Sequence, residues 1–186
     1  MKELLIKLQH FQRLITREFR PELYVRPMTD FLKAYKGNLI GVEIGVAHGY
    51  NTKAMLISLP NIKKMYLIDA WDLFEESRGE TYEYAKKNLK KFKDKTVFIK
   101  KFSDDAVNDL PEQLDFIYID AGKQTYEQVI KDIRGYYKKV RKGGVIGGHD
   151  FDGYYLTVCE ATIDFSREKK VKLYTSKNDW WIVKNE

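Results

Sequence analysis

Short apolar segments alternate with amphipathic ones along most of the chain. Apolar runs typical of strands occur at residues 39–44, 64–70, 96–99, 114–119, 145–146, 171–175 and 180–183. Apolar positions at steps of three and four predict helices at residues 49–59, 82–92, 126–140 and 155–169. Strands that alternate with helices indicate right-handed βαβ units and a largely parallel sheet.

The two ends of the chain depart from this alternation. The last two strands are separated only by residues 176–179, a connection that predicts an antiparallel hairpin. An apolar stripe predicts an N-terminal helix that ends near Arg20-Pro21, and its members are Leu4, Leu8, Phe11, Ile15 and Phe19. We therefore expect a helical extension over residues 1–37, acting as a lid or dimer contact, and a single α/β domain over residues 38–186.

Several local expectations follow from individual residues. Thr125 and Gln128 form a capping box that opens the helix reaching Val140. Gly143-Gly144 precedes a strand, and residues 30–32 open a short helix. The helix at 155–169 is expected to turn three side chains inward, namely Leu156, Cys159 and Ile163.

Composition limits the class of protein. The length of 186 residues suits one domain, and no apolar run approaches the roughly 18 residues of a membrane span. A single cysteine, Cys159, excludes an internal disulfide and a cysteine metal site. This usage indicates a reducing, cytoplasmic compartment.

The net charge of +6 is basic but spread out. Lysines are interspersed with carboxylates, as around Lys86-Lys87 and Lys90-Lys91, which is typical of solvated helix faces rather than of a nucleic-acid stripe. A basic surface still favours anionic partners.

Ligands of open parallel sheets bind outside the carboxyl ends of the strands. The first strand ends in Glu43-x-Gly45-x-x-x-Gly49, whose glycines allow a tight turn and close approach of backbone N–H groups. The spacing differs from G-x-G-x-x-G and lacks the Lys-Ser/Thr of a P-loop, which disfavours nicotinamide, flavin and nucleoside triphosphate sites.

The next two strand ends carry groups suited to a nucleoside. Asp69 can accept hydrogen bonds from both ribose hydroxyls. Trp71 can cover an adenine face or serve as an ordinary core aromatic. Ser103 or Asp104 can hydrogen-bond the adenine amino group, although Asp104 and Asp105 can also cap a helix.

These motifs, taken in order with the strand 115–120, resemble class I S-adenosylmethionine-dependent methyltransferases over roughly residues 38–185. The nearest branch contains small-molecule and sugar O-methyltransferases and cephalosporin-hydroxylase-like proteins. Its segment IDADHSYE is matched by residues 119–127, and its Gly-Gly-hydrophobic-Gly-Asp segment by residues 143–150.

The resemblance implies a Rossmann-like three-layer sandwich with a seven-stranded, mostly parallel sheet and a C-terminal antiparallel hairpin. It also implies S-adenosylmethionine as cofactor, with Glu43 anchoring its amino-acid end through water or backbone. The cofactor-binding set expected from the motifs is Glu43, Gly45, Gly49, Asp69, Trp71, Ser103, Asp104 and Asp120.

Some relatives hold a divalent cation after the fourth and fifth strands, where this chain has Asp120, His149 and Asp150. Two carboxylates suit Mg²⁺, and a histidine shifts the preference toward ions such as Mn²⁺. The same three residues can instead be catalytic, with His149 as general base for an acceptor hydroxyl. Lys123 stands where relatives often have histidine, which leaves the substrate open.

Three functions remain at this point. The first is methylation of a hydroxyl on a small molecule or sugar. The second is methylation of nucleic acid at ribose, since residues 120–123 lack the prolines used for base amines and no Lys-Asp-Lys-Glu set is evident. The third is a non-catalytic nucleoside-binding module with the same fold.

Overall fold

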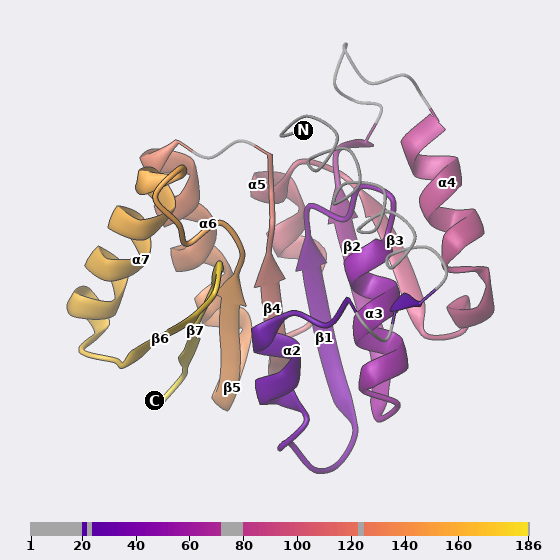
Figure 1. Ribbon diagram of the computed structural model, residues 1–186, viewed down its shortest axis with the longest axis horizontal. Coiled ribbons are helices and arrows are strands. Elements are labelled where there is room, and N and C mark those ends of the chain that lie inside the picture. The colour runs from indigo at the N-terminus through magenta and orange to yellow at the C-terminus, as the bar shows by residue number, and fades with distance from the viewer. Residues whose placement is uncertain (1–19, 22–23, 72–79, 123–124, 186) are drawn as a thin grey trace, which may run out of the picture.

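A single seven-stranded sheet forms the centre of the protein in the computed structural model, which describes residues 20–21, 24–71, 80–122 and 125–185 (Figure 1). The strand order is β3-β2-β1-β4-β5-β7-β6. Strand bounds are β1 (Leu39–Ile44), β2 (Ile62–Asp69), β3 (Thr96–Lys100), β4 (Leu114–Ile119), β5 (Val140–Gly148), β6 (Leu173–Ser176) and β7 (Asp179–Val183). β1 to β5 are parallel, while β7 runs antiparallel to β5 and β6, as the sequence predicts.

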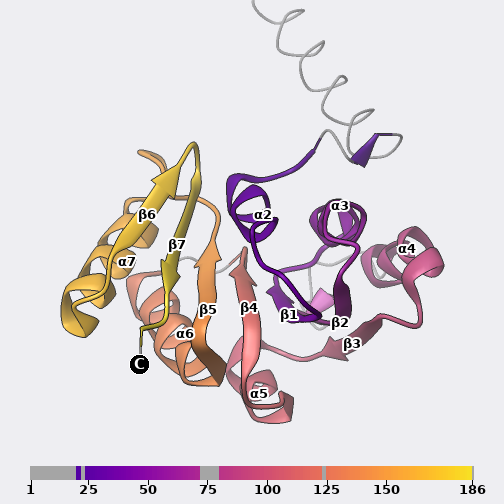
Figure 2. The ribbon, with the colours of Figure 1, turned by 90° about the horizontal axis from the view of Figure 1, so that it is seen from below.

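Helices cover both faces of this sheet, so the domain has three layers (Figure 2). Their bounds are α2 (Pro27–Leu32), α3 (Tyr50–Ser58), α4 (Glu80–Asn88), α5 (Ser103–Ala106), α6 (Tyr126–Lys139) and α7 (Leu156–Lys169), with short turns η3 (Lys90–Phe92) and η4 (Val107–Asp109). One face packs against α2, α3 and α4, and the other against α5, α6 and α7. The Rossmann-like sandwich is thus confirmed.

The central strand β4 shows why both faces are apolar. All six of its residues are buried. Ile117 and Ile119 point into the core under α6 and α7, whereas Phe116 and Tyr118 point into the core under α2 and α3. A strand covered on both sides loses the alternation of polar and apolar residues, which is the pattern the sequence shows there.

The boundary between α6 and β5 differs from the prediction. Val140 is not the last residue of the helix stripe, because its backbone is extended and pairs with Leu114 as the first residue of β5. The glycine pair does not precede the strand but lies within it. There the register shifts against β4, and Gly143 takes a φ of +73°, so the pair accommodates an irregularity in the strand.

The prediction for the inward face of α7 was wrong at Leu156, whereas Cys159 and Ile163 are half-buried. Leu156 is 60% exposed, because it lies in the first turn beyond the edge of the core. The helix instead buries one side made of Val158, Ala161, Thr162 and Phe165.

Two smaller features complete the comparison. Residues 30–32 end a helix that Pro27 begins, rather than opening one. The Thr125 side chain caps α6 by accepting from the Gln128 amide, as predicted, but the Gln128 side chain turns away toward Ser103, Asp104 and Asp132.

Residues 1–19 hold the predicted N-terminal helix and lie outside the described residues. Within the part that the structure covers, no helix has the length and apolar character needed to cross a membrane.

Candidate active site

Two hollows meet at the carboxyl edge of the sheet, where the strand order switches between β1 and β4. The Asp69 pocket, of about 400 Å³, is lined by Ile44, Gly45, Ile68, Asp69, Ala70, Lys101, Phe102, Ser103, Asp104, Asp105, Ala121, Gly122, Gln128 and Asp132. The Arg26 pocket, of about 480 Å³, is lined by Tyr24, Arg26, Glu43, Gly45, Val46, Ala47, His48, Tyr50, Asn51, Tyr84 and Asp120. Gly45 lines both pockets, so one extended ligand can cross from one to the other.

The loop between β1 and α3 brings backbone close to the end of β4. Gly45 has a φ of +85°, and a Cβ there would lie 2.0 Å from the Asp120 carbonyl oxygen. Gly49 has a φ of +76° and precedes the first turn of α3. Only glycine at position 45 allows this close approach, because any side chain would collide with backbone rather than with a mobile group.

Asp69 links the two loops that border its pocket. Its Oδ2 accepts from the Ala47 amide and its Oδ1 from the Trp71 amide, both at 2.7 Å. The carboxylate is therefore held at the end of β2, and it lines the Asp69 pocket, where a carboxylate can meet ligand hydroxyls.

Trp71 lies in the core and does not line either pocket. It is 3% exposed, donates its indole N–H to the Ala47 carbonyl at 2.9 Å, and packs against Tyr82 and Phe98. These contacts match the core-aromatic alternative. Phe102 instead lines the Asp69 pocket with a ring that is 45% exposed.

The far end of the Asp69 pocket is polar. Ser103 and Asp104 open α5, and both accept from the Gln128 amide nitrogen of α6, at 3.4 and 3.1 Å. Asp132, one turn further along α6, also accepts from Gln128. Burial raises the pKa of Asp132 to about 6, partly offset by hydrogen bonds from Ser103 and Gln128.

Glu43 lies beneath the Arg26 pocket and is 1% exposed. Its carboxyl accepts from the Asn51 side-chain amide at 3.0 Å and from the Thr52 hydroxyl. Burial raises the pKa of Glu43 to about 7, although the bonds from Thr52 and Asn51 lower it in part. Asn51 itself reaches the pocket surface, so Glu43 can act on a ligand through it.

This buried carboxyl makes a pH-dependent contribution to stability. Because its folded pKa lies above the ordinary value of 4.5, the folded state binds the proton more tightly. The contribution is complete below pH 4.5 and is lost as the pH rises through 7. Between pH 5 and 8, the free energy of unfolding of wild type should decrease as Glu43 loses its proton. In Glu43→Gln this decrease should be smaller by roughly 3 kcal/mol.

Denaturant unfolding at several pH values, compared between wild type and variant, measures this difference. The parallel contribution of Asp132 cancels in the comparison. The exposed Glu112→Gln is the matched control and should follow wild type. Identical pH profiles for Glu43→Gln and wild type would contradict a buried carboxyl with a raised pKa.

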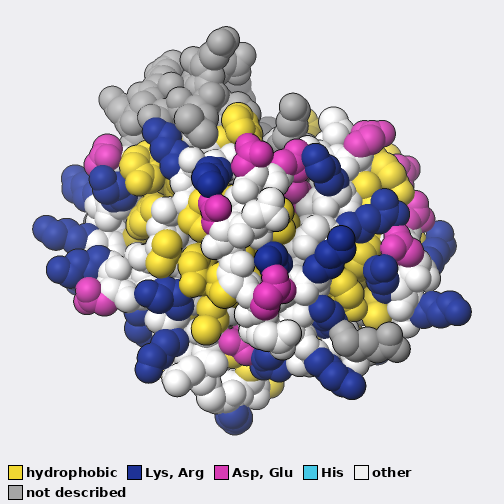
Figure 3. Space-filling model, turned by 180° about the vertical axis from the view of Figure 1, so that it is seen from behind, with side chains coloured by type: hydrophobic (Ala, Val, Ile, Leu, Met, Phe, Trp, Pro, Cys, Tyr) yellow, Lys and Arg dark blue, Asp and Glu magenta, His cyan; other side chains and the backbone are white. Residues whose placement is uncertain are grey.

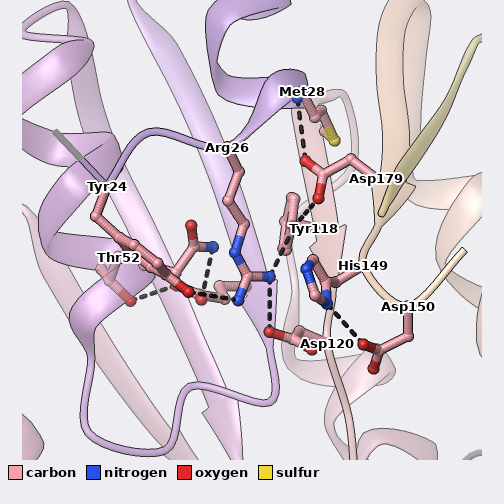
Figure 4. A network of polar contacts seen from close by, with 11 residues as sticks. Tyr24, Arg26, Met28, Thr52, Tyr118, Asp120, His149, Asp150 and Asp179 are labelled. Carbon is pink, nitrogen blue, oxygen red and sulfur yellow. Dashed lines mark hydrogen bonds and ion pairs between the residues drawn. The ribbon is translucent and has the colours of Figure 1, made fainter. Parts of the chain in front are cut away.

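Arg26 enters the site from the segment before α2 (Figure 4). Its Nη1 donates to the Tyr118 hydroxyl and to Asp120 Oδ2, each at 2.8 Å. Burial opposes the charged guanidinium, but Tyr118 and Asp120 outweigh it and the pKa of Arg26 is raised, so it stays charged. Nothing in the sequence singles out this arginine, since Tyr118 and Asp120 lie more than 90 residues away along the chain.

The three residues predicted as base or metal ligands come together. Asp120, His149 and Asp150 each offer a ligand atom, and these atoms lie within 4.8 Å of one another. His149 Nδ1 lies 2.6 Å from Asp150 Oδ1, and Asp150 has a φ of +64° at the turn after β5. This cluster borders the Arg26 pocket through Asp120 (Figure 4).

His48 also lines the Arg26 pocket, with its ring packed edge-on against Tyr84 at 5.1 Å. Lys123 and residues 72–79 lie outside the described residues.

Comparison with known proteins decides the family. A family model described as a methyltransferase domain matches residues 42–151. The chain belongs to this methyltransferase family. The match covers the glycine loop, Asp69, the pocket residues after β3 and the cluster at the ends of β4 and β5, and the predicted class I, S-adenosylmethionine-dependent assignment is confirmed.

One curated relative of the methyltransferase is "Uncharacterized protein R132" of Acanthamoeba polyphaga mimivirus. It is 33% identical over 127 residues, which cover 64% of this chain and 54% of that protein. The chain thus spans about half the length of this relative.

Solved structures similar to the methyltransferase include enzymes named for different acceptors. The O-methyltransferase NovP has a TM-score of 0.63 at 16% identity, covering 92% of this chain and 81% of that one. An rRNA methylase from Streptococcus thermophilus has a TM-score of 0.63 at 17% identity, covering 87% and 98%. The methyltransferase PaMTH1 from Podospora anserina, bound to S-adenosylhomocysteine, has a TM-score of 0.62 at 11% identity, covering 78% and 71%. At these identities the likeness shows the fold alone.

Sequence reasoning missed several groups that line the methyltransferase's two pockets. They are Tyr24, Arg26, Phe102, Gln128 and Asp132. Gln128 and Asp132 are four residues apart on one helix and so share a face. This spacing could have indicated a shared site, but Gln128 was assigned only to the helix cap.

Proposed function

We propose that this methyltransferase transfers a methyl group from S-adenosylmethionine to a hydroxyl of a small molecule or sugar. The observation that carries the proposal is the Asp120, His149 and Asp150 cluster beside the Arg26 pocket. A histidine hydrogen-bonded to a carboxylate suits removal of a hydroxyl proton.

The two pockets fit the donor. In this proposal the adenosine occupies the Asp69 pocket, with Asp69 accepting from the ribose hydroxyls and Ser103 or Asp104 near the adenine amino group. The amino-acid end crosses Gly45 into the Arg26 pocket, above Glu43 and beside Gly49. The cradle that a Cβ at Gly45 would fill supports this path.

When bound, S-adenosylmethionine supplies a methyl group on a cationic sulfur, and transfer breaks the sulfur–methyl bond as an oxygen–methyl bond forms. His149 accepts the hydroxyl proton at Nε2, because the hydrogen bond to Asp150 occupies Nδ1. Asp150 holds the imidazole in position through this hydrogen bond. Holding the acceptor oxygen in line with the sulfur–methyl bond can lower the activation free energy by several kcal/mol.

A divalent cation at Asp120, His149 and Asp150 is the alternative role of the cluster. The donor atoms are close enough for one ion. Asp120 Oδ2, however, already pairs with Arg26 at 2.8 Å, so the arrangement does not fit a second cation.

Nucleic acid is the competing acceptor. A basic hollow of about 730 Å³ lies where α6 and α7 end, and its lining includes Lys138, Lys169 and Lys170. Because α6 ends directly before β5, this hollow is at the opposite edge of the sheet from the cluster. On the face shown in Figure 3, Lys and Arg are interspersed with carboxylates. Ion pairs such as Lys131–Asp104 and Lys139–Glu112 join lysines and carboxylates of the described residues.

We further propose a division of the chain and a location for the protein. Residues 38–186 are proposed to form the catalytic domain. Of the extension predicted over residues 1–37, α2 packs in the core, so a lid or dimer contact is proposed for the part that precedes Arg26. The single cysteine supports a cytoplasmic location.

The test is methyl transfer from radiolabelled donor to a panel of phenols, catechols, sugars and RNA transcripts. We expect transfer to a hydroxylated small molecule, and a loss of at least about 100-fold in His149→Ala. Binding of S-adenosylhomocysteine by this variant should stay within about threefold of wild type. Labelling of RNA alone, or full activity in His149→Ala, would contradict the proposal.

A further inference from the structure

A buried cation already sits beside the cluster. The Arg26 side chain is 12% exposed, and its guanidinium lies over the Tyr118 ring, 5.3 Å from the ring centre. The same nitrogen, Nη1, contacts both the Tyr118 hydroxyl and Asp120 Oδ2. The arginine is therefore directed at the carboxylate that a metal ion would need.

A second carboxylate holds this arrangement from behind. Tyr118 donates its hydroxyl proton to Asp179 Oδ1 at 2.9 Å, and Asp179 Oδ2 accepts from the Met28 amide at 3.1 Å. Met28 is two residues from Arg26, so the backbone and the guanidinium of this segment are tied to one network (Figure 4). Asp179 is 1% exposed and is part of β7. The position of Arg26 is thus built into the core.

We infer that Arg26 is the resident cation of the cluster, and that a divalent ion binds Asp120, His149 and Asp150 only when Arg26 is removed from Asp120. Asp120 and Asp150 supply the negative charge of the cluster, and His149 supplies none. Arg26 neutralises one of them. A divalent ion would then lie within a few ångströms of a buried positive charge, where water screens the repulsion poorly.

The chemistry of the contact supports this role. A guanidinium is permanently charged and binds carboxylate oxygens with directed N–H groups. It can neutralise Asp120 without supplying an open coordination position for an acceptor oxygen. The inference uses the same cluster as the proposed function, but it concerns ion binding and does not depend on which acceptor is methylated.

The experiment is a Mn²⁺ titration followed by the electron paramagnetic resonance signal of the free ion, with no methyl donor or acceptor present. Wild type is expected to bind in the millimolar range or weaker at this site. Arg26→Gln should bind at least about tenfold more tightly. Adding Asp150→Ala to Arg26→Gln should remove the gain, which locates the ion at the cluster.

Arg134→Gln is the matched control, because it removes an arginine–carboxylate pair on the far helices and should leave Mn²⁺ binding unchanged. Micromolar binding by wild type that Asp150→Ala abolishes would overturn the inference. So would a folded Arg26→Gln with no gain in affinity. If Arg26→Gln does not fold, the wild-type titration still decides, since weak binding is required and tight binding at the cluster contradicts it. Failure here leaves methyl transfer by His149 untouched, and failure of the activity test leaves the Mn²⁺ result standing.

Discussion

Asp69→Ala is expected to weaken binding of S-adenosylhomocysteine at least about 100-fold. The carboxylate lines the Asp69 pocket, and in the proposed arrangement it accepts from both ribose hydroxyls. Hydrogen bonds to a charged group contribute roughly 1.5–3 kcal/mol each, so losing two of them gives at least this factor. The substitution also releases the Ala47 and Trp71 amides, which loosens the two loops that shape the pocket.

Isothermal titration calorimetry measures the effect, with circular dichroism to check folding. Asp30→Ala is the matched control, because Asp30 is an exposed carboxylate paired with Lys33, and neither residue lines the Asp69 or the Arg26 pocket. It should bind as wild type does. Affinity of Asp69→Ala within about threefold of wild type would mean that the ribose does not lie at the end of β2.

Gly45→Ala is expected to abolish measurable binding and to destabilise the fold. The φ of +85° alone costs an alanine about 1–2 kcal/mol. The new Cβ would also lie 2.0 Å from the Asp120 carbonyl oxygen, so the loop and the end of β4 must separate. Since Gly45 lines both pockets, this separation changes the path between them and moves Asp120 relative to His149 and Asp150.

Gly37→Ala is the control that measures the cost of backbone strain without a collision of the new Cβ. Gly37 has a nearly identical φ of +84°, but a Cβ there would meet nothing within 4 Å. Thermal unfolding and calorimetry on both variants should show a loss of about 1–2 kcal/mol and normal binding for Gly37→Ala. If Gly37→Ala and Gly45→Ala are equally destabilised and both still bind, the close approach at position 45 has no functional consequence.

The sheet could be predicted because short stretches of sequence mark each of its strands. Buried runs such as residues 114–119 are apolar apart from Asp115, and most of them are followed by a segment with the periodicity of a helix. The hairpin could be predicted from the length of one connection. The glycine loop and Asp69 could also be predicted, because a strand end followed by a turn places polar groups at the carboxyl edge of a parallel sheet.

The errors arose where neighbours distant in sequence decide the outcome. The end of α6 depends on Val140 pairing with Leu114, and the buried face of α7 depends on where the helix meets the core. Trp71 illustrates the same point, since its contacts with Tyr82 and Phe98 give it a core position. Arg26 is the clearest case, because a lone arginine before a proline gives no sign of a partner 94 residues away.

The acceptor is the part of the account that depends most on tertiary placement. The cluster joins the ends of β4 and β5, and Arg26 brings a third element to it from the N-terminal side. Sequence spacing predicted the first two and not the third. The charge of the cluster depends on Arg26. That charge decides whether the cluster acts as a base or binds a metal ion.

The most direct test of the central claim is calorimetric titration of the wild-type protein with S-adenosylmethionine and S-adenosylhomocysteine. We expect a single site of roughly micromolar affinity at the carboxyl edge of the sheet, for which the two ligands compete. Absence of binding by either nucleoside, with the protein shown to be folded, would contradict methyl transfer and leave the fold serving another function.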